Sequence, residues 1–585
     1  MKEKKKAIGR RDFIEKSAVA LGGILISGAL TESCSKDKDN TGDTPMPAEN
    51  SNRFESGVAS FDPTDSQVII WTRISPAKNE PKIGLDYKIA TDIGMVDIVK
   101  SGAIEALAED DYTISLDIKN LASNKRYYYQ FGIPGTQLYS LVGETKTLPK
   151  GMEANDIKLA ICSCSNYPSG LFNVYGAMAK SEADVVLHLG DYIYEYGQGE
   201  YGTNATTGTL GRAHLPANEI LSLDDYRTRY KQYKSDPQLQ LLHQKKPFIC
   251  VWDDHELAND AYKDGAENHT RGKEGDFNGR KAYSIQAYHE YIGIRTADKT
   301  KIYRSFTFGN ILDLHMLDTR VIGRDKQLNY ADYVSLSGRL DVDAFRTNWM
   351  DSGRSMLGVD QRSWLANALD SGKGGWQVLG QQILMAKMNV PAEIPPVLAE
   401  IMNAGGNISP EKIDRLKKLV IELITIKIKM ANNDPGITTE QRQRVSTTLP
   451  YNLDAWDGYP AEREHLYEMA KGKKLISLAG DTHNGWFSKL VSSDKTAVGN
   501  ELATSSVTSP GFEAYLGADA GFLSSLEKAL ATLVDDLEYA NVSQRGFVLA
   551  TFSAEKVVSQ WYYVSTIATP TTDSILGHTE TIQRV

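Results

Sequence analysis

Short runs in which apolar and polar residues alternate occupy residues 53–148. The clearest runs cover residues 66–72, 85–89, 112–116 and 126–131. A period of two places successive side chains on opposite faces of a strand, and the polar breaks between the runs are typical of turns. This segment therefore predicts a small N-terminal antiparallel β-sandwich domain.

From about residue 155 the pattern changes to short apolar strands with helical stretches between several of them. The predicted strands cover residues 158–162, 185–189, 248–252, 376–379 and 475–479, and two closing strands cover 546–552 and 557–564. Strands that alternate with helices predict an α/β fold, in which catalytic loops commonly follow the carboxyl ends of the strands. We therefore expect residues 149–585 to form one large catalytic domain.

One predicted helix falls between two of the polar loops. Residues 410–431 begin with Pro410-Glu411 and carry an apolar stripe at helical spacing, formed by Ile413, Leu416, Val420, Leu423 and Ile424. The scattered charged residues exclude a membrane span. The helix could pack on the core, cover the site as a lid or contact a membrane surface.

The composition is that of a large globular protein. The chain has 585 residues, of which 41% are hydrophobic and 24% charged, and this excludes a disordered, collagenous or multi-span membrane protein. A net charge of −10 implies no broad surface for polyanions, so no specific nucleic-acid binding is expected. Four cysteines are too few for a disulfide scaffold in a chain of this length.

The N-terminus is typical of an export signal. Basic residues crowd positions 2–11, and a short apolar run of residues 18–30 follows, which predicts a signal peptide over 1–33. Arg10-Arg11, with Phe13 two places on, resembles a twin-arginine signal and implies the twin-arginine export machinery as a partner. An ordinary secretory signal is the alternative.

A cysteine and a polar segment follow the predicted signal. Cys34 resembles the acylated cysteine of a lipoprotein, which would anchor the protein to a membrane; simple secretion is the alternative. Residues 34–52 are polar and predict a flexible tether. The expected location is therefore periplasmic or at the cell surface as a lipoprotein, or otherwise secreted. Without residues 1–33, which hold seven basic and four acidic residues, the net charge becomes −13.

Reactive side chains follow each of the five catalytic-domain strands. The loops hold Cys164 to Tyr167, Gly190 to Tyr196, Asp253 to Asp260, Gly380 to Gln382 and Gly480 to Asn484. Carboxylates at this density would repel one another unless cations compensate them. Thiolate and tyrosinate favour a ferric-type ion, whereas carboxylate oxygens suit harder ions such as Ca²⁺. The loops therefore predict a site with two kinds of metal.

Taken together, these motifs resemble the PhoD-like alkaline phosphatases, relatives of the purple acid phosphatases in the metallophosphoesterase superfamily. The resemblance covers residues 53–585 and is carried by Ser163 to Tyr167, His188 to Tyr196, Trp252 to Glu256, Leu317 to Arg320, Leu379 to Gln382, Trp456 to Pro460 and Gly480 to His483. It implies a metallophosphoesterase αββα sandwich for the large domain. It also implies one Fe³⁺ and one or two Ca²⁺ ions as cofactors.

The resemblance assigns a role to each motif residue. The Fe³⁺ ligands would be Cys164, Asp191, Tyr194 and His483. Asp191 would bridge to a Ca²⁺ that Asp254 and Asp481 also bind, and Asn259 would serve a second Ca²⁺. His255 would contact the phosphate or protonate the leaving oxygen.

The expected reaction is direct hydrolysis of a phosphate mono- or diester by a metal-activated hydroxide. A cationic side chain would stabilise the equatorial oxygens. Arg320 is the first candidate for this role, ahead of Arg227, Arg354 and Arg463. The rival functions are a phospholipase-type phosphodiesterase and a non-catalytic lipoprotein that binds phosphorylated ligands.

Several nearby residues favour structural roles. Cys162 could support the site as a neighbouring thiol, but a strand position two residues from Cys164 favours core packing. Cys250 lies inside an apolar strand and is expected in the core. His188 is expected to be a hydrogen-bonded structural residue.

Overall fold

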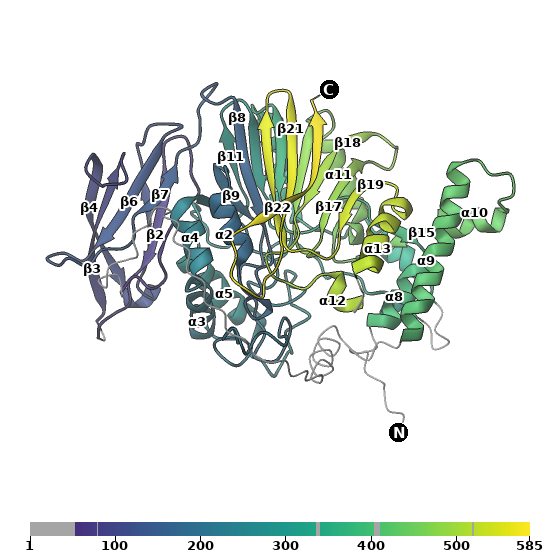
Figure 1. Ribbon diagram of the computed structural model, residues 1–585, viewed down its shortest axis with the longest axis horizontal. Coiled ribbons are helices and arrows are strands. Elements are labelled where there is room, and N and C mark those ends of the chain that lie inside the picture. Colours follow the sequence, from purple (N-terminus) through teal and green to yellow (C-terminus); the bar gives the residue numbers. More distant parts are fainter. Residues whose placement is uncertain (1–52, 79, 335–339, 403–409, 517–519, 585) are drawn as a thin grey trace, which may run out of the picture.

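The computed structural model describes residues 53–584 apart from 79, 335–339, 403–409 and 517–519. The predicted signal peptide, the tether and Cys34 lie outside the described residues. Within these ranges, two large mixed sheets form the centre of the molecule, a four-stranded sheet lies at one end and a group of helices lies at the other (Figure 1). No helix in the described part of the chain combines the length and apolar character needed to cross a membrane.

The first large sheet has nine strands. In spatial order they are β22 (Ser574–Gln583), β21 (Lys556–Val564), β20 (Gly546–Ser553), β8 (Asp156–Cys162), β9 (Val185–His188), β10 (Pro247–Cys250), β1 (Val58–Phe61), β2 (Val68–Arg73) and β5 (Thr113–Ile118). Strands β8, β9, β10 and β1 are parallel, and the flanking strands pair antiparallel. The parallel block aligns the ends of β8, β9 and β10, after which the predicted site loops begin.

The second large sheet has seven strands. Its spatial order is β11 (Arg304–Phe308), β12 (Leu312–Met316), β13 (Trp376–Gly380), β16 (Leu475–Ala479), β18 (Ala497–Ala503), β17 (Gly485–Val491) and β19 (Leu537–Asn541). Strands β12, β13, β16 and β18 are parallel. Every predicted strand of the catalytic domain is confirmed, whereas β12, which leads to the Arg320 loop, was not among them.

Apolar side chains join the two large sheets in one core. Leu159 and Val186 of the first sheet share this buried cluster with Leu314 and Val378 of the second. Helices α2 (Asn173–Lys180), α3 (Leu223–Lys234), α4 (Pro237–Lys245) and α5 (Phe277–Tyr291) pack against the first sheet, and α7 (Gly358–Ser371) and α11 (Pro460–Met469) against the second. The predicted α/β fold is thus confirmed, with mixed sheets.

The N-terminal residues form a further antiparallel sheet. Its strands are β4 (Ile98–Leu107), β3 (Lys82–Ala90), β6 (Arg126–Gly132) and β7 (Gly143–Lys146). Leu85 and Phe131 of this sheet share a buried core with Ile70 and Ile114, which lie on β2 and β5. β2 and β5 also belong to the nine-stranded sheet of the large domain, because β1 pairs with β2 on one side and in parallel with β10 on the other.

The predicted helix at residues 410–431 is α9 (Pro410–Ala431). It buries Leu416, Leu423 and Ile426 against the cluster that α8 (Ile394–Met402) and α13 (Ala520–Leu533) also join. It therefore packs on neighbouring helices. The remaining described α-helices and β-strands are α6 (Val342–Trp349), α10 (Thr439–Ser446), α12 (Phe512–Leu516), β14 (Asn389–Pro391) and β15 (Thr448–Pro450).

The buried thiols of Cys162 and Cys250 confirm the prediction of two core cysteines. His188 is also buried, and its Nε2 lies 2.8 Å from the hydroxyl of Tyr175, which confirms a hydrogen-bonded structural histidine.

A buried lysine lies beneath the N-terminal strands. The ammonium of Lys234 has no hydrogen-bond partner among the described residues and lies 4.2 Å from the ring centre of Trp71 and 5.3 Å from that of Phe61. Burial lowers the pKa of Lys234 to about 7. The aromatic faces attract the cation, but burial in an apolar environment favours the neutral amine.

We expect Lys234→Met to stabilise the protein in a pH-dependent way. The folded-state pKa of about 7 lies below the ordinary value of 10.5, so between these pH values the unfolded chain binds a proton that the folded chain does not. Wild-type stability therefore falls as the pH falls through this window. The substitution should raise the free energy of unfolding by on the order of 1–3 kcal/mol at pH 7, and the gain should shrink towards pH 10.

Urea denaturation followed by circular dichroism measures this difference at both pH values, with the exposed Lys119→Met as the control. A loss of stability at both pH values would show instead that the aromatic rings hold a protonated Lys234.

Candidate metal centre

The predicted site loops meet where the parallel strands of both sheets end. Cys164 follows β8, Asp191 follows β9 and Asp254 follows β10 on the first sheet, while Asp481 follows β16 on the second. Residues separated by about 320 positions are therefore brought to one place. The two sheets pack face to face, so their carboxyl ends open onto a common centre.

Several of these residues have left-handed backbone conformations. The φ angle is 63° at Cys164, 55° at Asp191, 62° at Asp481 and 62° at His483. Such angles cost non-glycine residues of order 1 kcal/mol or more and cluster at functional sites. Gly190, at φ 107°, must also be glycine, because a Cβ there would lie 2.6 Å from the backbone nitrogen of Asp253. These left-handed residues turn the chain sharply where each strand ends.

A buried group of sulfur, nitrogen and oxygen donors forms one half of the centre. Donor atoms of Cys164, Asp191 and His483 lie within 4.8 Å of one another. The Tyr194 hydroxyl donates to Oδ2 of Asp191 at 2.9 Å and lies 3.3 Å from Nε2 of His483. All four residues predicted to bind iron therefore adjoin one another.

Carboxylates form the other half of the centre. Asp191 groups with Asp254 and His255, and Asp253 groups with Asp254 and Asp481, in each case with donor atoms within 4.8 Å. Burial raises the pKa of Asp191 and of Asp253 well above the ordinary range. Asn259 lines the same small cavity as Asp191 and Asp254, so all the residues predicted to bind metal converge.

This donor set fits metal ions. Oδ2 of Asp253 is buried and has no hydrogen-bond partner among the described residues. Burial also raises the pKa of the Cys164 thiol and of the Tyr194 hydroxyl, so their anionic forms need a nearby cation. Thiolate, phenolate and imidazole suit a softer or trivalent ion, and carboxylates suit a hard divalent one.

Arg320 lies inside the centre, completely buried. Its Nη1 donates to Asp454 at 2.7 Å, its Nη2 to Asp481 at 2.9 Å and its Nε to Asp253. Burial opposes the charge, but Asp253, Asp254 and the other carboxylates outweigh it and raise the pKa of Arg320. The guanidinium is thus held by three aspartates, one of which is a predicted metal ligand.

The other predicted arginines are held by structural partners. Arg227 pairs with Glu290 and Arg463 with Asp457, while Arg354 lies over the ring of Tyr459. None of these three lines the cavity at the metal centre or the larger groove described below.

Glu195 orients His255. Its Oε2 lies 2.7 Å from Nδ1 of His255, and its Oε1 accepts from the Asn259 backbone and the Asn268 amide. Burial opposes protonation of His255, but Asp191, Glu195 and Asp254 outweigh it and raise its pKa. The ring lines the small cavity together with Asp481 and His483. His255 can therefore hold a proton beside the centre.

The sequence interpretation missed four supporting residues. Asp253, Glu195 and Glu256 lie inside quoted motifs, so their spacing offered a signal that could have been followed. Glu256 accepts from the backbone nitrogens of Asp191 and Asp253 and so ties two ligand turns together. Asp454 lies 134 positions from its partner Arg320 and carried no local signal.

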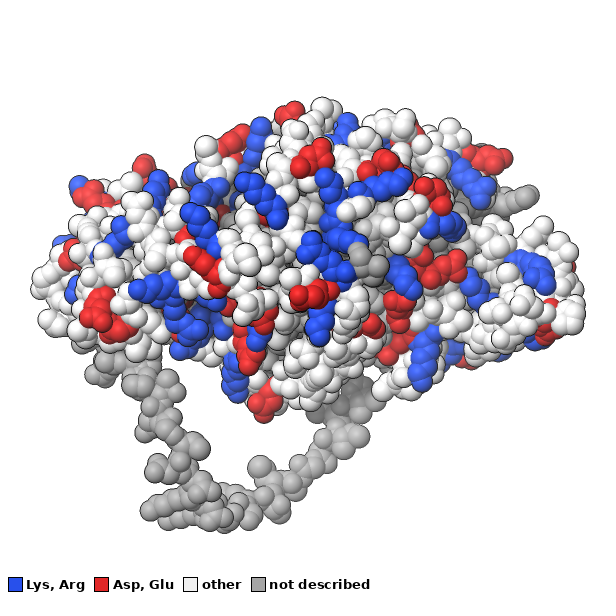
Figure 2. Space-filling view, turned by 90° about the horizontal axis from the view of Figure 1, so that it is seen from above, with Lys and Arg blue, Asp and Glu red and all other residues white. Residues whose placement is uncertain are grey.

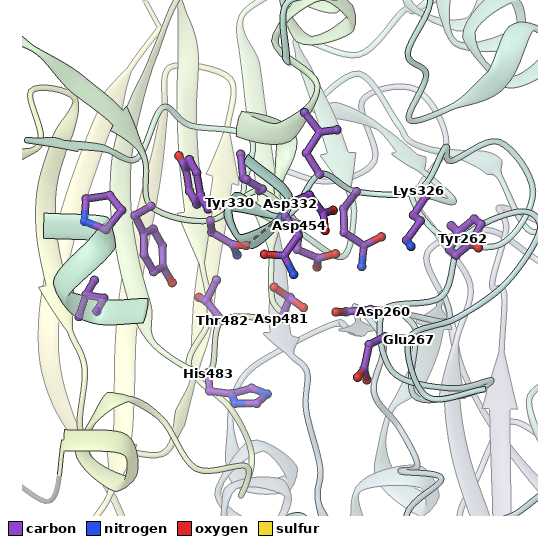
Figure 3. A pocket seen from close by; sticks show the side chains of 18 of the residues that line it. Asp260, Tyr262, Glu267, Lys326, Tyr330, Asp332, Asp454, Asp481, Thr482 and His483 are labelled. Carbon is purple, nitrogen blue, oxygen red and sulfur yellow. Dashed lines mark hydrogen bonds between the residues drawn. The ribbon is translucent and has the colours of Figure 1, made fainter. Parts of the chain in front are cut away.

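A groove of about 600 Å³ opens beside the centre (Figure 3). Asp481 and His483 form its floor, and Asp260, Glu267 and Lys326 lie to one side. Basic and acidic side chains intermingle over the molecular face seen in Figure 2.

Comparison with known proteins gives consistent matches. A family model described as PhoD-like phosphatase matches residues 159–561, and one described as its N-terminal domain matches residues 40–149. Alkaline phosphatase D of Bacillus subtilis (strain 168) is 33% identical over 529 residues, covering 87% of this chain and 78% of the relative. A solved structure of PhoD superposes with a TM-score of 0.71 at 28% identity, covering 92% of each chain.

We expect Asp191→Ala to remove bound metal and activity together. Asp191 belongs to both the sulfur-containing group and the carboxylate group, so its loss disrupts both halves of the centre. Elemental analysis should show loss of metal while circular dichroism stays that of the wild type. The exposed Asp86→Ala is the control, and unchanged metal content with full activity in Asp191→Ala would refute the assignment.

Glu195→Gln should separate proton positioning from metal binding. The amide keeps the size of the side chain but loses the charge that holds the His255 proton, so kcat should fall by roughly 10²-fold. Metal content should stay that of the wild type, in contrast to Asp191→Ala. Wild-type kcat in a folded Glu195→Gln variant would rule out this role for Glu195.

Proposed function

Because the chain belongs to the PhoD-like phosphatase family, we propose that it hydrolyses phosphate mono- and diesters at the centre formed by Cys164, Asp191, Asp254, Asp481 and His483. The single observation that carries this proposal is the convergence of these donors from both sheets within 4.8 Å of their neighbours. The family is one of phosphoric ester hydrolases, and its metal dependence agrees with the donor set.

The residues divide the metal ions between two sets of ligands. Cys164, Tyr194 and His483 would hold Fe³⁺ together with Asp191, which would also face Ca²⁺ with Asp254 and Asp481. Asn259 would serve a further Ca²⁺. Bound metal ions supply Lewis acidity that polarises the phosphoryl oxygens and lowers the pKa of a water molecule.

Side chains of the protein donate the proton to the leaving oxygen and hold the other groups of the centre in position. Glu195 fixes Nδ1 of His255, so the protonated ring can donate a proton to the leaving oxygen. Arg320 holds Asp253, Asp454 and Asp481 in place, which supports a positioning role in preference to binding of the equatorial oxygens. Burial of Glu195, His255, Arg320 and Asp253 keeps these electrostatic interactions strong.

Neither rival function is favoured. The comparisons give a phosphatase and not a phospholipase, and a non-catalytic binding protein would be expected to have lost some of the ligands that converge here.

The N-terminal segments support export as part of the proposal. Residues 1–33 would direct the chain to the twin-arginine machinery, and Cys34 would carry a lipid anchor with 34–52 as the tether. We assign residues 53–148 to an accessory β-sandwich domain and residues 149–585 to the catalytic domain. The shared core of β2, β5 and the four-stranded sheet supports the first assignment.

Metal removal tests the proposed function. The protein purified from cells that export it naturally should hydrolyse 4-nitrophenyl phosphate or bis(4-nitrophenyl) phosphate. Prolonged treatment with a chelator should lower the rate of hydrolysis by at least about 10²-fold, since metal binding supplies several kcal/mol of transition-state stabilisation. Readdition of Fe³⁺ with Ca²⁺ should restore more activity than Ca²⁺ alone. Full activity after elemental analysis shows no metal would refute the metal dependence.

A further inference from the structure

The groove beside the metal centre has an apolar wall on one side. We define this apolar wall as Pro395 and Leu398 of α8, Tyr451, and Phe512 and Leu516 of α12, all of which line the groove. Ile394 and Val397 of α8 are buried in the cluster behind it, at 5% and 4% exposure. Ile394 and Val397 therefore anchor α8 to the cluster, while Pro395 and Leu398 of the same helix line the groove.

The segment that carries part of this wall is connected directly to the metal ligands. The Ser509 hydroxyl donates to the Tyr194 hydroxyl at 2.6 Å, and the Pro510 carbonyl oxygen lies 2.8 Å from Nδ1 of His483. Phe512 lies two residues beyond Pro510 and is the first residue of α12. The start of α12 is thereby connected to two predicted ligands.

Aromatic contacts add a second connection. The ring of Phe512 lies 6.4 Å from that of Trp486 and 5.9 Å from that of Tyr451, measured between centres. Trp486 in turn donates from Nε1 to the Thr482 hydroxyl at 2.8 Å, beside His483. The apolar wall is thus packed against residues next to the centre, as is expected of a preformed ligand pocket.

The opposite side of the groove is predominantly acidic. Asp260 and Glu267 line it together with Lys326, which is the one lysine or arginine among the described residues that line the groove. Asp260 and Glu267 lie on the same side of Asp481 in Figure 3. A ligand that carries a further anionic group would meet repulsion here, whereas an uncharged apolar group would remove the apolar wall from water.

We propose that the groove selects phosphate esters whose organic group is apolar and uncharged, and that the apolar wall, through Leu398 and Phe512, determines this preference. The inference rests on the proposed function and names the substrate class of the same site. It excludes esters with a second phosphate or carboxylate on the organic group as preferred substrates.

Non-hydrolysable phosphonates test the preference as binding. In the metal-loaded full chain, inhibition of 4-nitrophenyl phosphate hydrolysis is measured for ethylphosphonate, hexylphosphonate and 5-carboxypentylphosphonate. Four added methylenes against a partly open apolar surface should tighten inhibition by hexylphosphonate at least about tenfold over ethylphosphonate. The terminal carboxylate should cancel this gain.

Variants of the apolar wall identify the residues responsible. Leu398→Ala and Phe512→Ala should each reduce the ratio of the ethylphosphonate to the hexylphosphonate inhibition constant to about two, because the apolar contact is lost. Phe512→Leu keeps an apolar side chain and should retain most of the ratio if Phe512→Ala proves unstable. Ile421→Ala, on the exposed side of α9, is the matched control and should not alter the ratio.

The outcomes separate two failures. Equal inhibition by the ethyl and hexyl compounds in an active enzyme, or an unchanged ratio in all folded variants of the apolar wall, would overturn this inference and leave the proposed function intact. Absence of hydrolysis of every phosphate ester by the metal-loaded wild type would overturn the proposed function itself.

Discussion

Compensation of buried negative charge is the constraint on which the centre depends. Asp191, Asp253, Asp254 and Asp481 meet at the ends of strands from both sheets, and burial raises the pKa of Asp191 and of Asp253 well above the ordinary range. Arg320 supplies one fixed positive charge among them. The remaining negative charge requires further cations. The adjoining thiol, phenol and imidazole groups favour a softer or trivalent ion for one of these cations.

The fold provides this concentration of charge through its strand geometry. Parallel blocks in each sheet align the carboxyl ends of the strands, and left-handed residues such as Cys164 and Asp481 turn the chain at once. Glu256 then ties the Asp191 and Asp253 turns together through their backbone nitrogens. The local backbone strain is sustained because the strand before each turn is fixed in a packed sheet.

Chemistry and selectivity share one short segment of chain. Ser509 and Pro510 contact the predicted iron ligands, and Phe512 begins the surface that faces the organic part of a substrate. α9 does not line the groove; it packs on α8, which does. In this arrangement α9 packs behind a helix that lines the groove.

The sequence by itself determined most of the strands that lead to the site, the site loops and the family. Short apolar runs identified β8, β9, β10, β13 and β16, because parallel strands that are buried on both faces are apolar almost throughout. The motif residues from Cys164 to His483 were identified because each lies in a loop directly after a strand. Each of these signals is confined to a few neighbouring residues.

Only the tertiary structure decided what depends on distant pairing. It joined β1 to β10 and so made the N-terminal strands continuous with the catalytic sheet. It placed Asp454 on Arg320, the predicted phosphate-binding arginine, across 134 positions of the chain. It also assembled the groove from α8, α12 and Lys326. The physical reason is that burial and charge act through space, so partners more than 100 positions apart leave no pattern in either local segment.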